Sequence, residues 1–227
     1  MPHLVPAVAE FCEPGRCGQA ERMPSGFRHI QVFLTAAARN PQTVGAVIPT
    51  SAHLAERLAG VVPAFGEPVV VELGPGTGPI TAAVQRRLAG RGRHLAVELD
   101  PILAQHVARE YPDVEVVLSD AVGLGDLLAE RDISEVDAVV SALPWSLIRP
   151  DRQHDILDVV AQALCPGAPF TTIAYLHARL MSGARGFRAL LDEVFDEVLT
   201  TSTVWRNLPP AVTYVCRRSR TRHGRER

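Results

Sequence analysis

The feature of this sequence best suited to chemistry is a glycine loop followed by well-placed acids. The apolar run Val69–Leu73 opens into Gly74-Pro-Gly-Thr-Gly78, whose alternating glycines let the backbone turn tightly and approach a ligand. A helix is predicted directly afterwards, and its unpaired N–H groups would face the same ligand. Glu98 ends the next apolar run, about 20 residues further on, where an acid can accept both hydroxyls of a ribose.

The spacing of the loop separates two kinds of nucleotide site. A dinucleotide fingerprint needs G-x-G-x-x-G, whereas this chain has G-x-G-x-G. This loop resembles motif I of class I S-adenosylmethionine-dependent methyltransferases; another nucleotide-binding domain or a fortuitous glycine turn is the alternative. The resemblance implies that Glu72 and the loop face the methionine part, Glu98 the ribose and Asp120 the adenine. The cofactor-binding residues expected from it are Glu72, Gly74, Gly76, Thr77, Gly78, Glu98, Leu99, Asp120, Ala121 and Ser141.

The methyl acceptor is expected beside the ends of the fourth and fifth strands. The fourth delivers Ser141-Ala-Leu-Pro-Trp145, a loop that commonly walls the pocket in amine methyltransferases. The aromatic face of Trp145 would favour a cationic amine product, unless the ring only fills core space. The fifth ends in Tyr175-Leu-His177, and either ring could orient an amine, accept its proton or be satisfied in the core. Ser141, Trp145 and Tyr175 are the catalytic candidates, and Leu143, Pro144, Trp145, Tyr175, His177 and Arg206 are the substrate-binding candidates.

Arg206 belongs to the predicted terminal hairpin. Its guanidinium is a candidate phosphate clamp, with a solvated turn arginine as the alternative. Methyl transfer itself needs little acid–base machinery, because the sulfonium already activates the methyl group and alignment supplies much of the barrier lowering, about 7–11 kcal/mol. We therefore expect a shaped, dry pocket rather than a dedicated base.

Beyond Glu67 the pattern alternates between strands and helices, which predicts a mostly parallel sheet covered on both faces. The predicted strands are Val69–Leu73, His94–Glu98, Val114–Leu118, Asp137–Ala142 and Phe170–Leu176. One helix carries Ile156 to Leu164 and stops at Pro166-Gly167, and another carries Phe187, Leu190, Leu191, Val194 and Val198. The apolar runs Glu197–Val204 and Ala211–Cys216 are too close for a crossover helix, so they predict an antiparallel hairpin.

The ends of the chain differ from this core. Residues 1–25 are rich in proline and glycine and are expected to be a flexible leader, and residues 26–60 to form a helical arm. In the arm, the amphipathic stretch Phe27–Ala38 could pack over the site or enter a membrane surface, and a second helix follows Thr50-Ser51. The methyltransferase domain is expected over residues 61–216. Residues 217–227 form a basic tail with six arginines and one glutamate.

Composition narrows the class of protein. The 227 residues are 47% hydrophobic, enough for one large α/β domain, and the formal net charge of −2 gives no overall reason to expect nucleic acid as a partner. The chain contains no lysine, so the basic tail could hold anionic lipid through arginine alone or simply be solvated. The four cysteines show no paired spacing, and the sequence has no metal-ligand spacing, no secretory signal and no membrane-length apolar run. These features predict a cytoplasmic protein without a metal, which could bind peripherally to the inner face of the membrane.

From Phe33 to Arg218 the sequence resembles the bacterial phospholipid N-methyltransferases. The matching segments are Arg39-Asn-Pro41, Val44–Ser51, Val71–Gly78, Val97–Asp100, Val139–Pro144, Trp205–Pro210 and Tyr214–Arg218. The resemblance implies a Rossmann-like fold with a seven-stranded sheet and terminal hairpin, S-adenosylmethionine as cofactor, and S-adenosylhomocysteine as product. It also implies methylation of the phosphatidylethanolamine amine, with binding to anionic membranes through the N-terminal helix and basic residues. Trp145, where an aliphatic residue is expected, and Tyr175-Leu-His177 depart from the family pattern.

Three other functions are compatible with the same motifs. RNA adenine dimethyltransferases have a similar motif I and Val-Glu-Leu-Asp segment, but use asparagine at the position of Ser141 and carry a C-terminal helical domain. A small-molecule N- or O-methyltransferase of a biosynthetic pathway would suit the altered acceptor pocket. A scaffold that binds S-adenosylmethionine without transfer, or a cyclase, would also retain an intact motif I.

Overall fold

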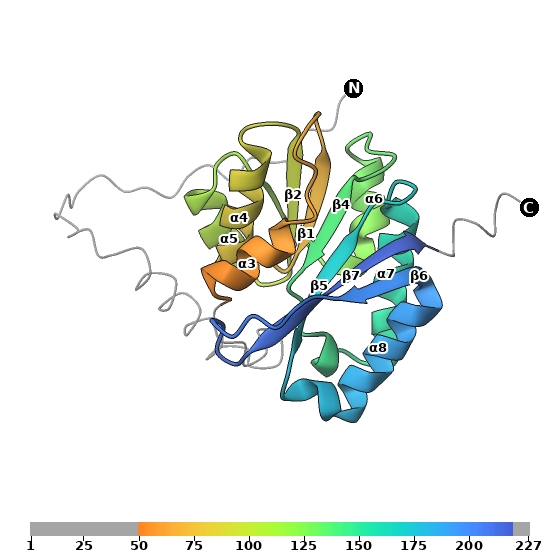
Figure 1. The fold of residues 1–227 in the computed structure, drawn as a ribbon. Helices are drawn as coiled ribbons and strands as arrows, with labels where there is room; N and C mark the ends of the chain where they lie inside the picture. The colour runs from red at the N-terminus through yellow and green to blue at the C-terminus, as the bar shows by residue number, and fades with distance from the viewer. Residues whose placement is uncertain (1–49, 220–227) are drawn as a thin grey trace, which may run out of the picture.

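The computed structural model describes residues 50–219. The expected leader, the amphipathic stretch at Phe27–Ala38, Cys12, Cys17 and the last eight residues of the basic tail lie outside this range. Within it, the chain forms one seven-stranded sheet with helices on both faces (Figure 1). The α/β fold predicted from the alternating pattern is therefore confirmed.

The sheet has the strand order β3-β2-β1-β4-β5-β7-β6. The strands are β1 (Val69–Leu73), β2 (Arg93–Glu98), β3 (Glu115–Leu118), β4 (Ala138–Ser141), β5 (Phe170–Tyr175), β6 (Phe195–Thr200) and β7 (Ala211–Ser219). The first five strands pair in parallel, and β7 pairs antiparallel with both β5 and β6. The order reverses between β1 and β4, so the carboxyl ends of the parallel strands open a crevice beside β1, the usual ligand position in such sheets.

The helices divide into two layers. Figure 1 shows α3, α4 and α5 on one side of the sheet and α6, α7 and α8 on the other. Their bounds are α3 (Ala52–Ala59), α4 (Pro79–Leu88), α5 (Pro101–Glu110), α6 (Leu124–Ala129), α7 (Pro150–Ala163) and α8 (Ser182–Val194). Three short 3-10 turns, η1 (Ala121–Gly123), η2 (Trp145–Leu147) and η3 (Ala178–Leu180), also lie within the described residues.

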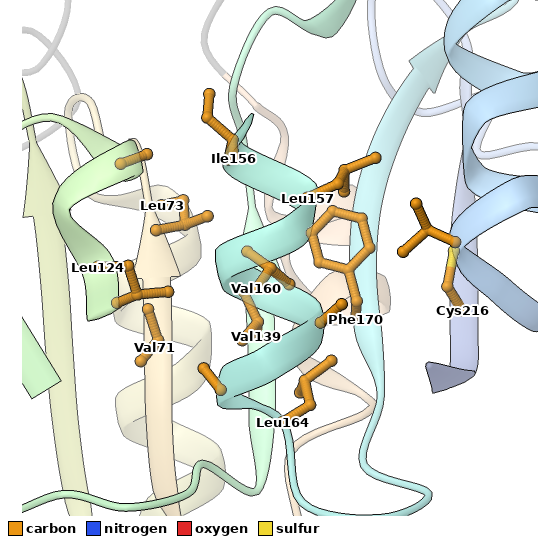
Figure 2. Close-up of a cluster of buried hydrophobic side chains, with 14 of the residues drawn as sticks. Val71, Leu73, Leu124, Val139, Ile156, Leu157, Val160, Leu164, Phe170 and Cys216 are labelled. Atoms are coloured by element: carbon orange, nitrogen blue, oxygen red, sulfur yellow. The ribbon is translucent and has the colours of Figure 1, made fainter. Parts of the chain in front are cut away.

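The larger core lies between the sheet and α6, α7 and α8. Figure 2 shows α7 placing Ile156, Leu157 and Val160 against strand residues that include Val139 and Phe170. These side chains are at most 3% exposed, and full burial of such a side chain stabilises the fold by about 1.5–3 kcal/mol. Because central strands are covered on both faces, β1 and β4 read as continuous apolar runs rather than alternating ones.

On the opposite face, α3 joins the second core. Ser51 caps this helix, its hydroxyl accepting the Leu54 N–H at 3.3 Å, as the sequence predicted. Leu54 and Leu58 are fully buried in the cluster that also contains Val70 and Ile80. The helix assigned from sequence to the N-terminal arm is therefore part of the folded unit.

Differences from the sequence analysis occur at the ends of elements. The terminal hairpin is confirmed. Helix α8 ends at Val194, so the prediction that Val198 lies on this helix is wrong: Val198 belongs to β6 and pairs with Cys216 of β7. Helix α7 ends at Ala163, before Pro166-Gly167, because Leu164 turns away to form a bridge with Val136. Strand β7 continues to Ser219, which brings the first two arginines assigned to the tail into the sheet.

The turn entering β2 provides a test of stability. Gly92 has a φ of 67°, and an added Cβ would lie 2.0 Å from the Pro68 carbonyl oxygen, which already accepts the Arg93 N–H. Gly90 has a φ of 80° but no atom within 4 Å of such a Cβ. We therefore expect Gly92→Ala to lower the free energy of unfolding by about 1–3 kcal/mol more than Gly90→Ala. Urea denaturation of both variants measures this difference, and equal losses would contradict the steric account.

Candidate functional site

The carboxyl ends of the parallel strands surround a first cavity of about 380 Å³. Its walls are Thr50, the segment after β1, the ends of β2 and β3, the loop after β4, and the start of α7. Of the cofactor-binding residues expected from sequence, the lining contains Gly74, Gly76, Thr77, Glu98, Leu99, Asp120 and Ala121. Glu72, Gly78 and Ser141 do not line it.

Glu98, at the end of β2, holds the glycine loop in place through hydrogen bonds. Its Oε2 accepts the Gly76 N–H at 3.0 Å, and its Oε1 accepts the N–H groups of Leu99 and Asp100 at 2.9 and 3.0 Å. Each carboxylate oxygen can accept more than one hydrogen bond, so capacity remains for a ligand hydroxyl. The carboxylate therefore shapes the loop and faces the cavity at the same time.

Burial raises the pKa of the Glu98 carboxyl above its ordinary value of 4.5. The backbone N–H groups of Asp100, Gly76 and Leu99 lower it in part, and the negative charge of Asp100 raises it further. A carboxylate whose pKa is raised by desolvation is typical of a binding site, because the fold alone would be more stable without the buried charge.

Asp120 lies on the opposite wall, with both carboxylate oxygens engaged. One accepts the Val122 N–H at 3.1 Å, and the other pairs with the guanidinium of Arg152. Arg152 and Arg149, the N-cap residue of α7, also line the cavity. The sequence analysis missed both arginines, because the direction in which the first turn of α7 faces depends on tertiary packing. An adenine contact to Asp120 would require Arg152 to share this carboxylate or move aside.

Glu72 is buried between β1 and β2 instead of facing the cavity. Its Oε2 lies 3.1 Å from His94 Nε2, and both side chains have no exposed surface. The Gln85 amide nitrogen lies 2.9 Å from His94 Nδ1, on the other side of the imidazole ring. The reason is strand alternation: Glu72 shares the face of Val70, which packs against α4.

A second cavity of about 330 Å³ adjoins the first. Ala142, Leu143, Pro144 and Leu147 belong to the walls of both. The rest of the second lining is mostly apolar and comes from η2, β5, η3, α8, Pro209 and β7, and its larger polar or aromatic members are Trp145, Tyr175, His177, Arg179, Phe187 and Tyr214. The structure therefore brings together all the substrate-binding residues expected from sequence except Arg206.

The Tyr175 hydroxyl is a buried polar group in the wall of the second cavity. Among residues 50–219, no donor or acceptor meets hydrogen-bond geometry with its Oη. Burial raises the pKa of this phenol above its ordinary value of 10.0, and the nearby Thr50 hydroxyl offsets part of the rise. Since Thr50 lines the first cavity and Tyr175 the second, this hydroxyl lies where the two cavities approach each other. It remains protonated at neutral pH.

Trp145 and Ser141 form a structural pair. The indole N–H donates to the Ser141 hydroxyl at 3.2 Å, which also accepts the Leu143 N–H at 3.3 Å. The indole is 3% exposed and stacks on Phe187 with ring centroids 4.5 Å apart. Ser141 is fully buried and lines neither cavity, so it positions the loop after β4 instead of facing the site. Trp145 packs into the core and also lines the second cavity, where its expected contact with the acceptor stays a prediction.

Arg206 points away from both cavities. Its Nη1 lies 3.1 Å from His53 Nε2 at the surface, and the residue is exposed. Its neighbour Asn207 is the residue that holds the loop: its Oδ1 accepts the Ser51 N–H and its amide donates to the Pro209 carbonyl. The expected phosphate clamp within the site is therefore not formed, because the loop is tied to the start of α3.

Comparison with known proteins identifies the family. No protein-family model matches the chain. The chain is 33% identical over 189 residues to the ornithine lipid N-methyltransferase of Singulisphaera acidiphila, covering 82% of this chain and 94% of that protein. The chain belongs to the class I S-adenosylmethionine-dependent methyltransferases, in the family of this ornithine lipid N-methyltransferase. It is therefore a methyltransferase whose cofactor is S-adenosylmethionine.

Other similar proteins either match a smaller part of this chain or share only its fold. The ribosomal RNA small subunit methyltransferase A of Kineococcus radiotolerans is 36% identical over 119 residues, or 49% of this chain and 37% of that protein. The O-methyltransferase of Bacillus cereus, solved in complex with SAH, has a TM-score of 0.58 and is 16% identical, over 86% of this chain and 93% of that chain. At that level of identity, the likeness shows the Rossmann-like methyltransferase fold alone.

The residues of the first cavity fit the cofactor. Its volume lies within the range of small-molecule sites, about 300–1,000 Å³. At Gly76 an added Cβ would meet no protein atom within 4 Å, so the loop leaves open space beside the carboxylates of Glu98 and Asp120. These groups offer acceptors for ribose hydroxyls and an adenine amine. Within residues 50–219, no group of His, Cys, Asp or Glu is arranged to hold a metal ion.

Proposed function

We propose that this methyltransferase transfers a methyl group to the primary amine of a membrane aminolipid head group. Phosphatidylethanolamine, implied by the sequence resemblance, and ornithine lipid, named for the relative in Singulisphaera, are the two acceptors to compare. The observation that carries the proposal is the apolar second cavity, which shares a wall with the first at Leu143 and Pro144. An acceptor held there would lie next to the methyl donor.

The second cavity suits a neutral amine. When bound, S-adenosylmethionine supplies a methyl group already activated by its sulfonium. The apolar lining removes water from the amine and lowers its pKa, which favours the neutral nucleophilic form. A methyl acceptor needs its lone pair aligned with the methyl group, so a stiff wall is more useful here than a strong base.

Tyr175 is the residue best placed to orient that amine. The Thr50 hydroxyl lies near its buried oxygen without meeting hydrogen-bond geometry, so a lone pair on this oxygen can accept an amine N–H. The raised pKa of the phenol argues against a phenolate base at neutral pH. Leu143 and Pro144 would fix the position of the amine, held in turn by the Trp145–Ser141 pair.

A transfer assay tests the proposal. Purified full-length protein is incubated with methyl-labelled S-adenosylmethionine and, in separate reactions, detergent-dispersed phosphatidylethanolamine, ornithine lipid, ribosomal RNA and small amines. We expect label in one of the lipids. Label only in RNA or only in small amines would contradict the proposal, and binding of the cofactor without transfer to any acceptor would support a scaffold.

A variant of Tyr175 tests the orienting role. Tyr175→Phe removes one hydrogen bond to the amine and should lower kcat about 10-fold, since such a bond contributes about 0.5–1.5 kcal/mol. The affinity for S-adenosylmethionine should stay unchanged, because the phenol lines the second cavity and not the first. Steady-state kinetics with calorimetry measures both quantities. An unchanged kcat would show that the hydroxyl does not position the acceptor.

A further inference from the structure

Large apolar side chains are exposed around the mouth of the second cavity. Nine large hydrophobic side chains within residues 50–219 are strongly exposed, and five of them lie on three neighbouring segments. These are Leu147 in η2, Leu180 and Met181 at the end of η3, and Trp205 and Leu208 in the loop between β6 and β7, with exposed fractions of 62%, 82%, 57%, 73% and 74%. We call this group the apolar rim. Such clustering is unusual, since exposed apolar side chains are normally scattered.

The three segments flank one opening. Leu147, Met181 and Pro209 all belong to the wall of the second cavity, which places η2, η3 and the β6–β7 loop around it. A backbone hydrogen bond from Leu176 to Pro210 ties the last two segments together. Figure 1 shows both on the lower side of the view, where β5 ends and β7 begins.

The charge of these segments is uniformly positive. Residues 176–188 contain three arginines, residues 201–210 contain Arg206, and neither stretch has an aspartate or glutamate. Arg179 and Arg206 are exposed, and no ion pair within the described residues involves either of them. A surface that combines exposed leucine, methionine and tryptophan with arginine that has no carboxylate partner matches the interface of an anionic bilayer, where the indole lies at head-group level and the guanidinium binds phosphate.

We propose that the apolar rim docks the protein on an anionic membrane surface, with Trp205 inserted at the level of the head groups. This inference rests on the proposed lipid acceptor and extends it. A docked protein would hold the mouth of the second cavity against the leaflet, so a head group could enter while its acyl chains stay in the bilayer. Arg179 and Arg206 would bind lipid phosphates beside the opening. This gives Arg206 a role at the membrane surface instead of inside the site.

Tryptophan fluorescence tests the docking directly, because the chain has only two tryptophans and Trp145 is buried. Full-length protein is mixed with vesicles of phosphatidylcholine and phosphatidylglycerol that contain a brominated phosphatidylcholine. We expect a blue shift and quenching of the emission, both lost in Trp205→Phe. Vesicle sedimentation of the protein without any change in Trp205 emission would overturn the proposal. Protection of Trp205 from acrylamide before vesicles are added would also overturn it, since residues 1–49 or a second copy would then cover the rim.

Charge variants give an independent readout. The variant Arg206→Gln should weaken vesicle binding about 5-fold, and more at low ionic strength. The matched variant Arg109→Gln removes an exposed arginine at the opposite edge of the sheet and should bind like the parent. Because Arg206 lines neither cavity, Arg206→Gln should lower activity on vesicles and keep it on detergent-dispersed lipid, which separates docking from the proposed reaction. Equal vesicle binding by both variants would contradict docking through the rim.

Discussion

Gly76→Asn should weaken binding of S-adenosylmethionine by about 100-fold or more, equivalent to about 2.7 kcal/mol, without unfolding the protein. Gly76 has a φ of 58°, and asparagine is the side chain that best tolerates this left-handed backbone. A Cβ at this position meets no protein atom, so the new amide would extend into the first cavity and occupy space that the cofactor needs. Calorimetric titration and thermal unfolding measure the two effects separately.

Gly167→Asn is the matched control for this variant. Gly167 has a φ of 79° and open space around its Cα, but it lies in the turn before β5, at the edge of the sheet remote from the cavity. The same substitution there should leave cofactor affinity unchanged. If Gly76→Asn also bound the cofactor normally, the first cavity would not be the cofactor site.

Glu98→Gln is expected to reduce cofactor affinity by about 100-fold, because hydrogen bonds to a charged acceptor contribute about 1.5–3 kcal/mol each. The replacement keeps the shape of the side chain, yet its amide can satisfy only some of the donors that Glu98 now binds. If the oxygen keeps Leu99 and Asp100, the amide nitrogen faces the Gly76 N–H and displaces the loop. Glu115→Gln, at an exposed ion pair with Arg131, makes the same chemical change away from the site and should have no effect on affinity.

The raised pKa of Glu98 predicts a pH dependence with a defined direction. Its folded pKa lies above 4.5, so its contribution to folding stability is fully present below pH 4.5 and is lost as pH rises through the folded pKa. Cofactor binding follows the opposite direction, because it needs the ionised acceptor and weakens as pH falls through that pKa. Affinity measured against pH should show a midpoint above 4.5 that disappears in Glu98→Gln. A midpoint unchanged by this substitution would assign the titration to another group.

The position of the cofactor site could be predicted from sequence because its signals are local. An apolar run followed by alternating glycines specifies a strand, a tight loop and a helix within a few residues. The short connection between the last two apolar runs likewise requires an antiparallel hairpin. Glu98 could be placed for the same reason, since it ends a strand that had to lie beside β1.

The contacts of individual side chains could not be predicted, because they depend on residues distant in sequence. Glu72 meets His94 because the register pairs Glu72 with Ala96, two residues further along β2. Arg152 reaches Asp120 only through the way α7 packs over the sheet. The sequence left open whether Trp145 faces the acceptor or fills core space. The ring stacks on Phe187 of α8, a contact between residues far apart in sequence.

The most direct measurement of the central claim is tandem mass spectrometry of a lipid product. The full-length protein is incubated with S-adenosylmethionine carrying a trideuterated methyl group and with vesicles containing phosphatidylethanolamine and ornithine lipid. We predict that the deuterated methyl group is found on the head-group nitrogen of one of these lipids. Unmodified lipids, in a reaction where the same protein preparation methylates RNA or a small amine, would contradict the account.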